Sequence, residues 1–226
     1  MNQSPALTHD APRPPAPRAR SLRLYAAVLG VVLAVAGLSL VALRLARPAP
    51  PLPIVGEVPA FSMRDQRERA VTERSLRGAV SVVDFFFTSC PVACPRLTGR
   101  MAELGKQLAA RGGDARSRVR LVSITVDPET DTPAKLMEYA RRYQADDDRW
   151  WFLTGEVGQL SRVVVDGFKV SYQKADPAMG INEIMHGNWF VLVDARGRIR
   201  GYYLSDEADR LRDLVNDAER LASEKE

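Results

Sequence analysis

The chain contains very few residues of the types that usually bind metals or carry redox chemistry. Among its 226 residues there are only two cysteines, Cys90 and Cys94, and only two histidines, His9 and His186. It has no glycine-rich phosphate loop, no Ser-His-Asp order and no His-x-x-x-His pattern, so no such motif competes with the cysteine pair as the centre of the chemistry. Its 32 basic and 28 acidic residues are too evenly balanced for nucleic acid to be the main partner, and it has no basic-aromatic run.

One long hydrophobic run lies near the N-terminus. The uncharged segment Leu24–Leu43 is rich in Leu, Val and Ala, and a helix needs about 20 such residues to cross a bilayer. Arginines follow it, without a convincing small-residue cleavage site, so we interpret it as an uncleaved anchor rather than a signal peptide. We therefore predict four regions: a disordered cytoplasmic tail at 1–23, a single transmembrane helix at 24–43, a Pro-rich linker at 44–54 and one domain at 55–226.

The arginines around this run predict its orientation. More of them precede the run than follow it: Arg13, Arg18, Arg20 and Arg23 come before it, Arg44 and Arg47 after it. By the positive-inside rule, the N-terminus is then cytoplasmic and the domain is exported to the periplasmic side of an inner membrane. That compartment is oxidising, so the simplest interpretation of a lone cysteine pair is a disulfide. Against this, closing a loop of only four residues stabilises a fold far less than closing a long one.

The exported domain alternates between hydrophobic runs of strand length and helical patterns. The predicted order is a polar hairpin (61–72), a strand (80–87), a helix starting near Pro95 and ending at 112–113, a strand (119–126), a helix starting at Thr132-Pro133, a strand (150–153), a helix weakened by β-branched residues (157–165), a hairpin (188–204) and a last helix. This alternation predicts an α/β sandwich with a partly parallel sheet. Sites in such sheets lie beyond the carboxyl ends of strands, and Cys90 directly follows the first central strand.

The two cysteines can close a disulfide or clamp a soft metal. They stand in the segment Cys90-Pro91-Val92-Ala93-Cys94-Pro95, at the predicted start of a helix, where the partial positive charge of the helix N-terminus favours thiolate. Redox enzymes of the thioredoxin type more often use Cys-x-x-Cys. The extra residue here lets both sulfurs face a shared third body as well as each other.

His186 is the only imidazole in the predicted exported domain. A lone loop histidine is more often a surface residue than a ligand, but two thiolates and one imidazole together make a three-coordinate soft site that suits Cu(I). Structural zinc would want a fourth protein ligand. Met179 and Met185 are interpreted as gap-filling core residues. Asp127, which ends a strand next to the cysteine strand, is the carboxylate expected to face the site.

Three segments in this order resemble the Sco/SenC family. They are the residues 87–95 (FTSCPVACP), the residues 123–133 (SITVDPETDTP) and a single histidine before 190–194 (FVLVD). The resemblance covers roughly 56–204 and implies a membrane-anchored, thioredoxin-like protein that binds copper and serves assembly of the copper centre of cytochrome c oxidase. It also implies that Cys90, Cys94 and His186 are the copper ligands.

The sequence departs from the family at two positions beside these ligands. Val92 stands where an acid often follows the first Cys-Pro, and Met185 stands where many members have Asp directly before the histidine. The implied ligands are retained and the local negative charge is not. The departures therefore concern the partner surface and the affinity for copper more than the existence of the site.

These observations lead to one main hypothesis and two rivals. The main hypothesis is a copper chaperone, a non-enzyme, that takes copper from a donor, depends on a thiol reductant and delivers copper or reducing power to the copper-bearing oxidase subunit. The first rival is a thiol-disulfide oxidoreductase in which Cys90 and Cys94 are catalytic and His186 is incidental. The weaker rival is a peroxide-sensing or peroxide-reducing relative of the same fold.

Overall fold

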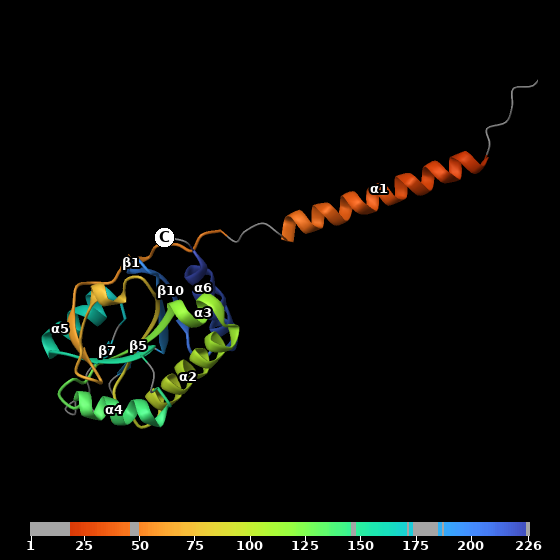
Figure 1. Cartoon of the computed structure of the whole chain (residues 1–226). Helices are drawn as coiled ribbons and strands as arrows, with labels where there is room; N and C mark the ends of the chain where they lie inside the picture. Colours follow the sequence, from red (N-terminus) through yellow and green to blue (C-terminus); the bar gives the residue numbers. More distant parts are fainter. Residues whose placement is uncertain are drawn as a thin grey trace, which may run out of the picture. The chain divides into compact units, whose positions relative to one another are not determined.

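The structure is a computed structural model of the whole chain, and it describes residues 19–45, 50–145, 148–170, 172–173, 185–186 and 188–224. The chain divides into two compact units, Met1–Pro51 and Leu52–Glu226 (Figure 1). Each unit is described by itself below.

The first unit contains one long helix, α1 (Ala19–Leu45). Its segment Arg23–Val41 is apolar and long enough to cross a membrane, and none of that segment is buried against the rest of the chain. The helix contains the predicted anchor at 24–43 and extends beyond it at both ends. The tail predicted to be disordered spans 1–23, but its last five residues, 19–23, are part of α1. Residues 1–18 lie outside the described residues.

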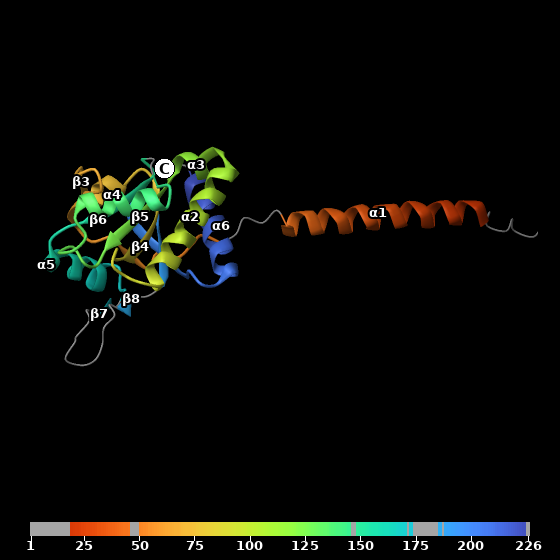
Figure 2. The same ribbon diagram turned by 90° about the horizontal axis from the view of Figure 1, so that it is seen from below.

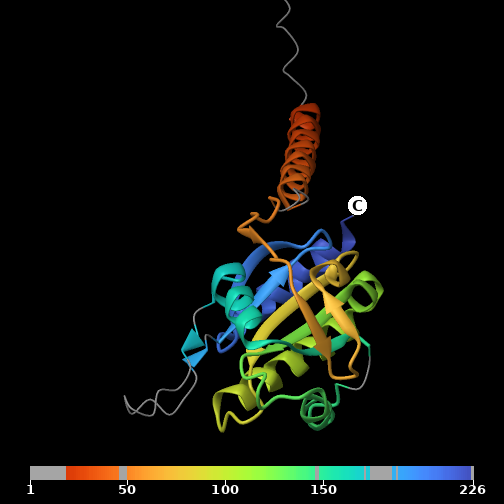
Figure 3. The ribbon, with the colours of Figure 1, turned by 90° about the vertical axis from the view of Figure 1, so that its left-hand side faces the viewer.

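The second unit is built on one eight-stranded mixed sheet (Figures 1 and 3). Its spatial order is β1-β10-β9-β4-β5-β6-β2-β3. The strands are β1 (Gly56–Glu57), β2 (Ser62–Asp65), β3 (Ala70–Thr72), β4 (Val80–Phe86), β5 (Val119–Thr125), β6 (Trp150–Thr154), β9 (Trp189–Val193) and β10 (Arg198–Leu204). Strands β4, β5 and β6 run parallel at its centre, whereas the two predicted hairpins form its antiparallel parts.

The central strand β4 explains why this sheet forms here. All seven of its residues are buried, as expected for a strand that is covered on both faces. On one face Phe86 packs against Tyr139, and on the other Phe85 meets Phe168 edge to face. Tyr139 also shares a hydrogen bond with Thr98, 3.0 Å between the two hydroxyl oxygens, which joins the helices of the first face.

The helices surround the sheet much as the periodicity predicts (Figures 1 and 3). They are the 3₁₀ turn η1 (Glu73–Leu76), α2 (Ala93–Arg111), α3 (Gly113–Arg118), α4 (Pro133–Arg142), α5 (Val157–Ser161), the π-helical turn η2 (Arg162–Gly167) and α6 (Ala208–Ser223). Thr132 caps α4 by accepting from the backbone N–H of Lys135, as predicted.

Three local details differ from the predictions. Helix α2 begins at Ala93, before Pro95, because a proline fits anywhere in the first turn, where no intrahelical N–H bond is lost. The glycine pair at 112–113 ends α2 but leads directly into the short helix α3. The segment predicted as one helix at 157–165 changes to π-helical geometry at Arg162, next to the β-branched run.

The strand register fixes what lies at the carboxyl end of β4. Val83 of β4 pairs with Val191 of the antiparallel strand β9. Strand β9 therefore begins, at Trp189, on the side where β4 ends. Asn188, which directly precedes β9, therefore lies at the same end of the sheet as the cysteine segment.

The domain's first residues attach at the opposite end of the sheet. The backbone N–H of Val55 donates to the carbonyl of Ile199, 2.9 Å, and Ile199 pairs with Val193, which in turn pairs with Ser81 near the start of β4. The predicted linker therefore joins the domain at the amino end of β4, whereas Cys90 follows its carboxyl end.

A buried arginine fixes the end of the predicted linker to the domain. Arg200 donates to the carbonyls of Leu52 and Pro53 and forms an ion pair with Asp194, 2.8 Å. Its side chain is only 5% exposed, so these bonds are shielded from water. The compact second unit thus begins at Leu52, before the predicted boundary at 55.

Candidate metal centre

Cys90 and Cys94 meet where β4 passes into α2. The backbone N–H of Cys94 donates to Sγ of Cys90, 3.2 Å, and the N–H of Phe87 donates to Sγ of Cys94, 3.4 Å. A turn returns the Cys90 N–H to the carbonyl of Phe87, 3.3 Å. Neither cysteine forms a disulfide in the structure. Two sulfurs are therefore brought together at the predicted strand–helix junction, each already held by a backbone donor.

The two thiols differ in exposure. Cys90 is half-buried and Cys94 is fully buried. Burial is the main cause that raises the pKa of the Cys94 thiol, and the donor at Phe87 opposes this only in part. For Cys94 the sequence-based expectation of a favoured thiolate was therefore wrong, because desolvation of the buried sulfur outweighs the helix N-terminus. Cys90 is the sulfur that a solvent-borne partner can reach first.

A buried carboxylate from a neighbouring loop contacts the cysteine segment. Asp131 lies in the loop between β5 and α4 and is fully buried. It accepts the backbone N–H of Thr88 at 3.0 Å, the hydroxyl of Thr88, and the hydroxyl of Thr125 at the end of β5. Among the described residues, Asp127 makes no such bond to the cysteine segment. The sequence analysis expected Asp127 to face the site, whereas Asp131 is the acid that is bonded to the cysteine segment.

Asp84 is a further buried acid beneath the cysteine segment. It lies in the middle of β4, and neither of its carboxylate oxygens has a hydrogen-bond partner in the described part of the chain. Burial raises its pKa to about 7, and the nearby hydroxyl of Ser123 opposes this only in part. The charge of Asp84 also contributes to the raised pKa of Cys94. A lone Asp within an apolar run was the signal in the sequence that could have identified it.

The structure describes only the backbone of His186. Strand β8 (Met185–His186) pairs with β7 (Tyr172–Gln173) in a separate two-stranded ribbon, with His186 opposite Tyr172 (Figure 2). The side chains of His186 and Met185, and the whole of Met179, lie outside the described residues. Among the residues that the structure does describe, no group of three or more His, Cys, Asp or Glu side chains could hold a metal. His186 as the third ligand therefore remains a prediction.

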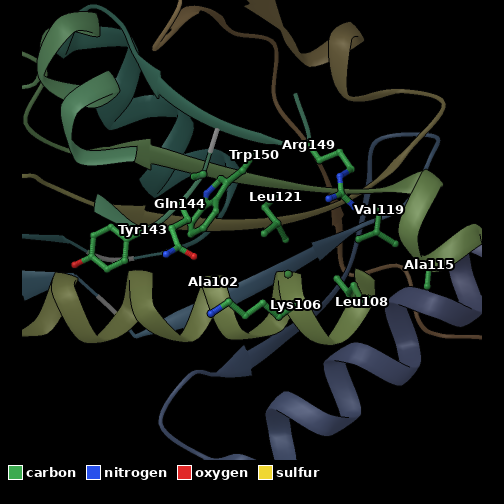
Figure 4. Close-up of a pocket in the computed structure, with 12 residues that line it drawn as sticks. Ala102, Lys106, Leu108, Ala115, Val119, Leu121, Tyr143, Gln144, Arg149 and Trp150 are labelled. Atoms are coloured by element: carbon green, nitrogen blue, oxygen red, sulfur yellow. The ribbon is translucent and has the colours of Figure 1, made fainter. Parts of the chain in front are cut away.

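A pocket elsewhere in the domain is separate from the thiols (Figure 4). It has a volume of about 160 Å³ and lies between α2 and the amino-terminal starts of β5 and β6, with Val119 and Trp150 in its wall. Cys90 follows the carboxyl end of the parallel strand β4. The chemistry of the cysteine pair is therefore not housed in this pocket.

Comparison with known proteins decides the family. The chain matches the SCO1/SenC family over residues 55–223, which is most of its length. The chain belongs to the SCO1/SenC family. It is 33% identical over 166 residues to the SCO1 protein homolog of Bacillus subtilis (strain 168), covering 73% of this chain and 82% of that protein. The resemblance noted in the sequence is thereby confirmed.

Solved Sco structures share the fold. One is BsSco, a member of the Sco family of cytochrome c oxidase assembly proteins in which a disulfide switch was identified; it has a TM-score of 0.67 and 30% identity, covering 77% of this chain and 99% of that one. Another is ScoI of Bradyrhizobium japonicum with copper bound, with a TM-score of 0.61 and 26% identity, covering 74% of this chain and 99% of that one. These matches confirm the predicted thioredoxin-like fold.

Proposed function

We propose that this protein is a membrane-anchored copper chaperone that binds Cu(I) through the thiolates of Cys90 and Cys94 and the imidazole of His186. The observation that carries the proposal is that the two cysteines, not linked by a disulfide, lie in contact at the strand–helix junction in a chain of the SCO1/SenC family. Soft sulfur ligands select Cu(I), and copper is here the cargo of the protein.

The geometry supports a stepwise capture of the cargo. Half-buried Cys90 is the first sulfur within reach of a donor. Binding at buried Cys94 requires loss of the thiol proton, and a coordinated metal stabilises the thiolate that burial disfavours. The imidazole then completes a three-coordinate site. Release to an acceptor follows the reverse order. The copper is then last held by Cys90, the sulfur that an incoming ligand can approach.

The surroundings of the protein are part of the proposal. We place the N-terminus in the cytoplasm and the domain on the periplasmic side of an inner membrane, on the arginine distribution around α1. The acceptor is the copper-bearing subunit of cytochrome c oxidase, as suggested by relatives described as oxidase assembly proteins. A separate copper donor and a thiol reductant are required, because the oxidised pair cannot bind Cu(I).

Copper titration of the full chain in detergent micelles tests the proposal. The reduced protein should bind one Cu(I), and the bound metal should protect both cysteines from alkylation. The protein oxidised to the Cys90–Cys94 disulfide should bind none, because a disulfide offers no thiolate. Equal copper loading in both states would refute the thiol ligand set. Disulfide-reducing turnover without copper binding would instead identify a thiol-disulfide oxidoreductase.

A further inference from the structure

Successive backbone groups of the segment before Cys90 form hydrogen bonds with both cysteines and with Asp131. The N–H of Phe87 donates to Sγ of Cys94, its carbonyl accepts from the N–H of Cys90, and the N–H of the next residue, Thr88, donates to Asp131. The peptide group between Phe87 and Thr88 therefore has its carbonyl on one cysteine and its N–H on a carboxylate. Rotation of that peptide plane would break the bond to the Cys90 N–H and the bond to Asp131, next to the Phe87 N–H that contacts Sγ of Cys94.

Asp131 is the group that prevents this rotation. It is separated from Thr88 by 43 residues and reaches it from the loop that precedes α4. One carboxylate oxygen accepts the Thr88 N–H and the Thr125 hydroxyl, and the other accepts the Thr88 hydroxyl. The Thr125 hydroxyl itself accepts the N–H of Asp127, 3.0 Å. A bidentate acceptor thus joins the cysteine segment to the end of the neighbouring strand β5.

We propose that Asp131 is a positioning residue for Cys90 and Cys94, which fixes the peptide at Phe87–Thr88 and thereby holds both sulfurs in the geometry that binds metal and closes the disulfide. The predicted effect on Cu(I) affinity rests on the proposed function. The predicted effect on the thiol–disulfide equilibrium does not, because it concerns only how close the two sulfurs are held. Residues that orient metal ligands from behind typically change metal affinity 10- to 100-fold when removed.

The chain offers a matched control for loss of a buried aspartate. Asp65 is also fully buried and also accepts three bonds, from the N–H groups of Arg67 and Arg69 and from the Arg69 side chain. It ends β2, which is separated from β4 by β6 and β5 in the sheet. Asp65→Ala therefore removes a similar cluster of bonds without touching the cysteine segment.

Two equilibrium constants decide the inference, both measured on the full chain in detergent micelles. The first is the thiol–disulfide equilibrium of Cys90 and Cys94 in glutathione buffers without metal. The second is the Cu(I) dissociation constant, measured by competition with a Cu(I) chelator. The variants are Asp131→Ala, Asp131→Asn, Thr88→Val and the control Asp65→Ala.

Asp131→Ala should shift the thiol equilibrium several-fold toward the dithiol, because two sulfurs that are held less firmly have a lower effective concentration. It should also weaken Cu(I) binding about 10- to 100-fold. Asp131→Asn should restore both constants to within about threefold of the parent, since its oxygen can accept the Thr88 N–H and its amide can donate to the Thr88 hydroxyl. Asp65→Ala should leave both within about twofold.

Values within twofold of the parent for Asp131→Ala would overturn the inference, as would an equal change in Asp65→Ala. If Asp131→Ala does not fold, Thr88→Val decides: a several-fold shift of the thiol equilibrium supports the inference and an unchanged one overturns it. If the parent itself binds no Cu(I), the proposed function fails, while the thiol equilibrium still decides the role of Asp131.

Discussion

The two segments that supply the proposed ligands are built very differently. The cysteine segment leaves a seven-residue, fully buried central strand, enters a helix of 19 residues and is bonded to Asp131. The histidine segment is a two-residue strand that pairs with another two-residue strand outside the main sheet. Rigid elements hold ligands more precisely than loops do. The sulfurs are therefore positioned by the main sheet and helix α2, whereas the backbone of His186 lies in a short ribbon.

On the proposed function, this difference would allow copper to be both held and released. A site with all ligands on rigid elements would bind tightly and exchange slowly, because most affinity differences lie in the rate of release. A third ligand on a minor ribbon can be exchanged at lower cost than either thiolate. The comparison therefore predicts a ranking of effects, with the sulfurs first, the imidazole second and the ribbon third.

Loss of either thiol should have the largest effect. Cys90→Ser and Cys94→Ser should each abolish stoichiometric Cu(I) binding, because a hydroxyl is a poor ligand for a soft metal. Competition with a Cu(I) chelator measures this directly. Ser89→Ala, a change at the exposed neighbouring residue, is the control and should bind as the parent does. Full binding by either serine variant would contradict the two-thiolate site.

Loss of the imidazole should have the next largest effect. His186→Ala should weaken Cu(I) binding on the order of 100-fold, at least as much as loss of a residue that only orients a ligand. The alkylation rate of Cys90 in the metal-free protein should not change. His9→Ala removes the other histidine of the chain and serves as the control. Parent-like copper affinity in His186→Ala would make the imidazole a bystander.

Disruption of the ribbon should have a smaller effect than loss of the ligand. Tyr172→Pro replaces the residue opposite His186 with one that has no N–H and a fixed φ, which disfavours strand pairing. Cu(I) binding should weaken about 3- to 10-fold, with the thiol–disulfide equilibrium unchanged, and the same chelator competition measures it. Gln173→Ala keeps the backbone able to pair and should resemble the parent. An unchanged affinity in Tyr172→Pro would show that the ribbon does not place the imidazole.

The last prediction concerns the rigid side of the comparison and is measured as stability rather than as copper affinity. The pKa of Asp84 is raised from 3.8 to about 7 by burial. Between pH 3.8 and about pH 7, the carboxyl group of Asp84 loses its proton in the unfolded chain and keeps it in the folded chain. The free energy of unfolding therefore falls as the pH rises. Asp84→Asn removes this loss and should gain stability relative to the parent between pH 4 and pH 8, by at most about 4 kcal/mol.

Denaturant unfolding at the two pH values measures this difference. Ser81→Ala, at another buried polar residue of β4, is the control; a hydroxyl does not titrate in this range, so the variant should keep the parent's pH dependence. A pH dependence in Asp84→Asn equal to that of the parent would show that Asp84 ionises normally in the folded state.

Much of the fold could be predicted because local sequence patterns specify its strands and helices. The apolar run at 80–87, the helical spacing that follows it and the Thr132-Pro133 start each became the expected element. The irregular part at 157–165 could not be predicted in detail, since the choice between α- and π-helical geometry depends on packing against the sheet. The ribbon of β7 and β8 was missed because two-residue strands leave no periodicity to detect.

The residues available for the chemistry can be read from the chain alone: two cysteines four residues apart, one histidine beyond the anchor, and a strand–helix junction at the cysteines. Their environment follows from the packing of distant segments. The raised pKa of Cys94 comes from burial under other elements, and Asp131, rather than Asp127, reaches the cysteine segment across 43 residues of chain. Desolvation and hydrogen bonding between distant segments depend on the packed fold, which no short stretch of sequence encodes.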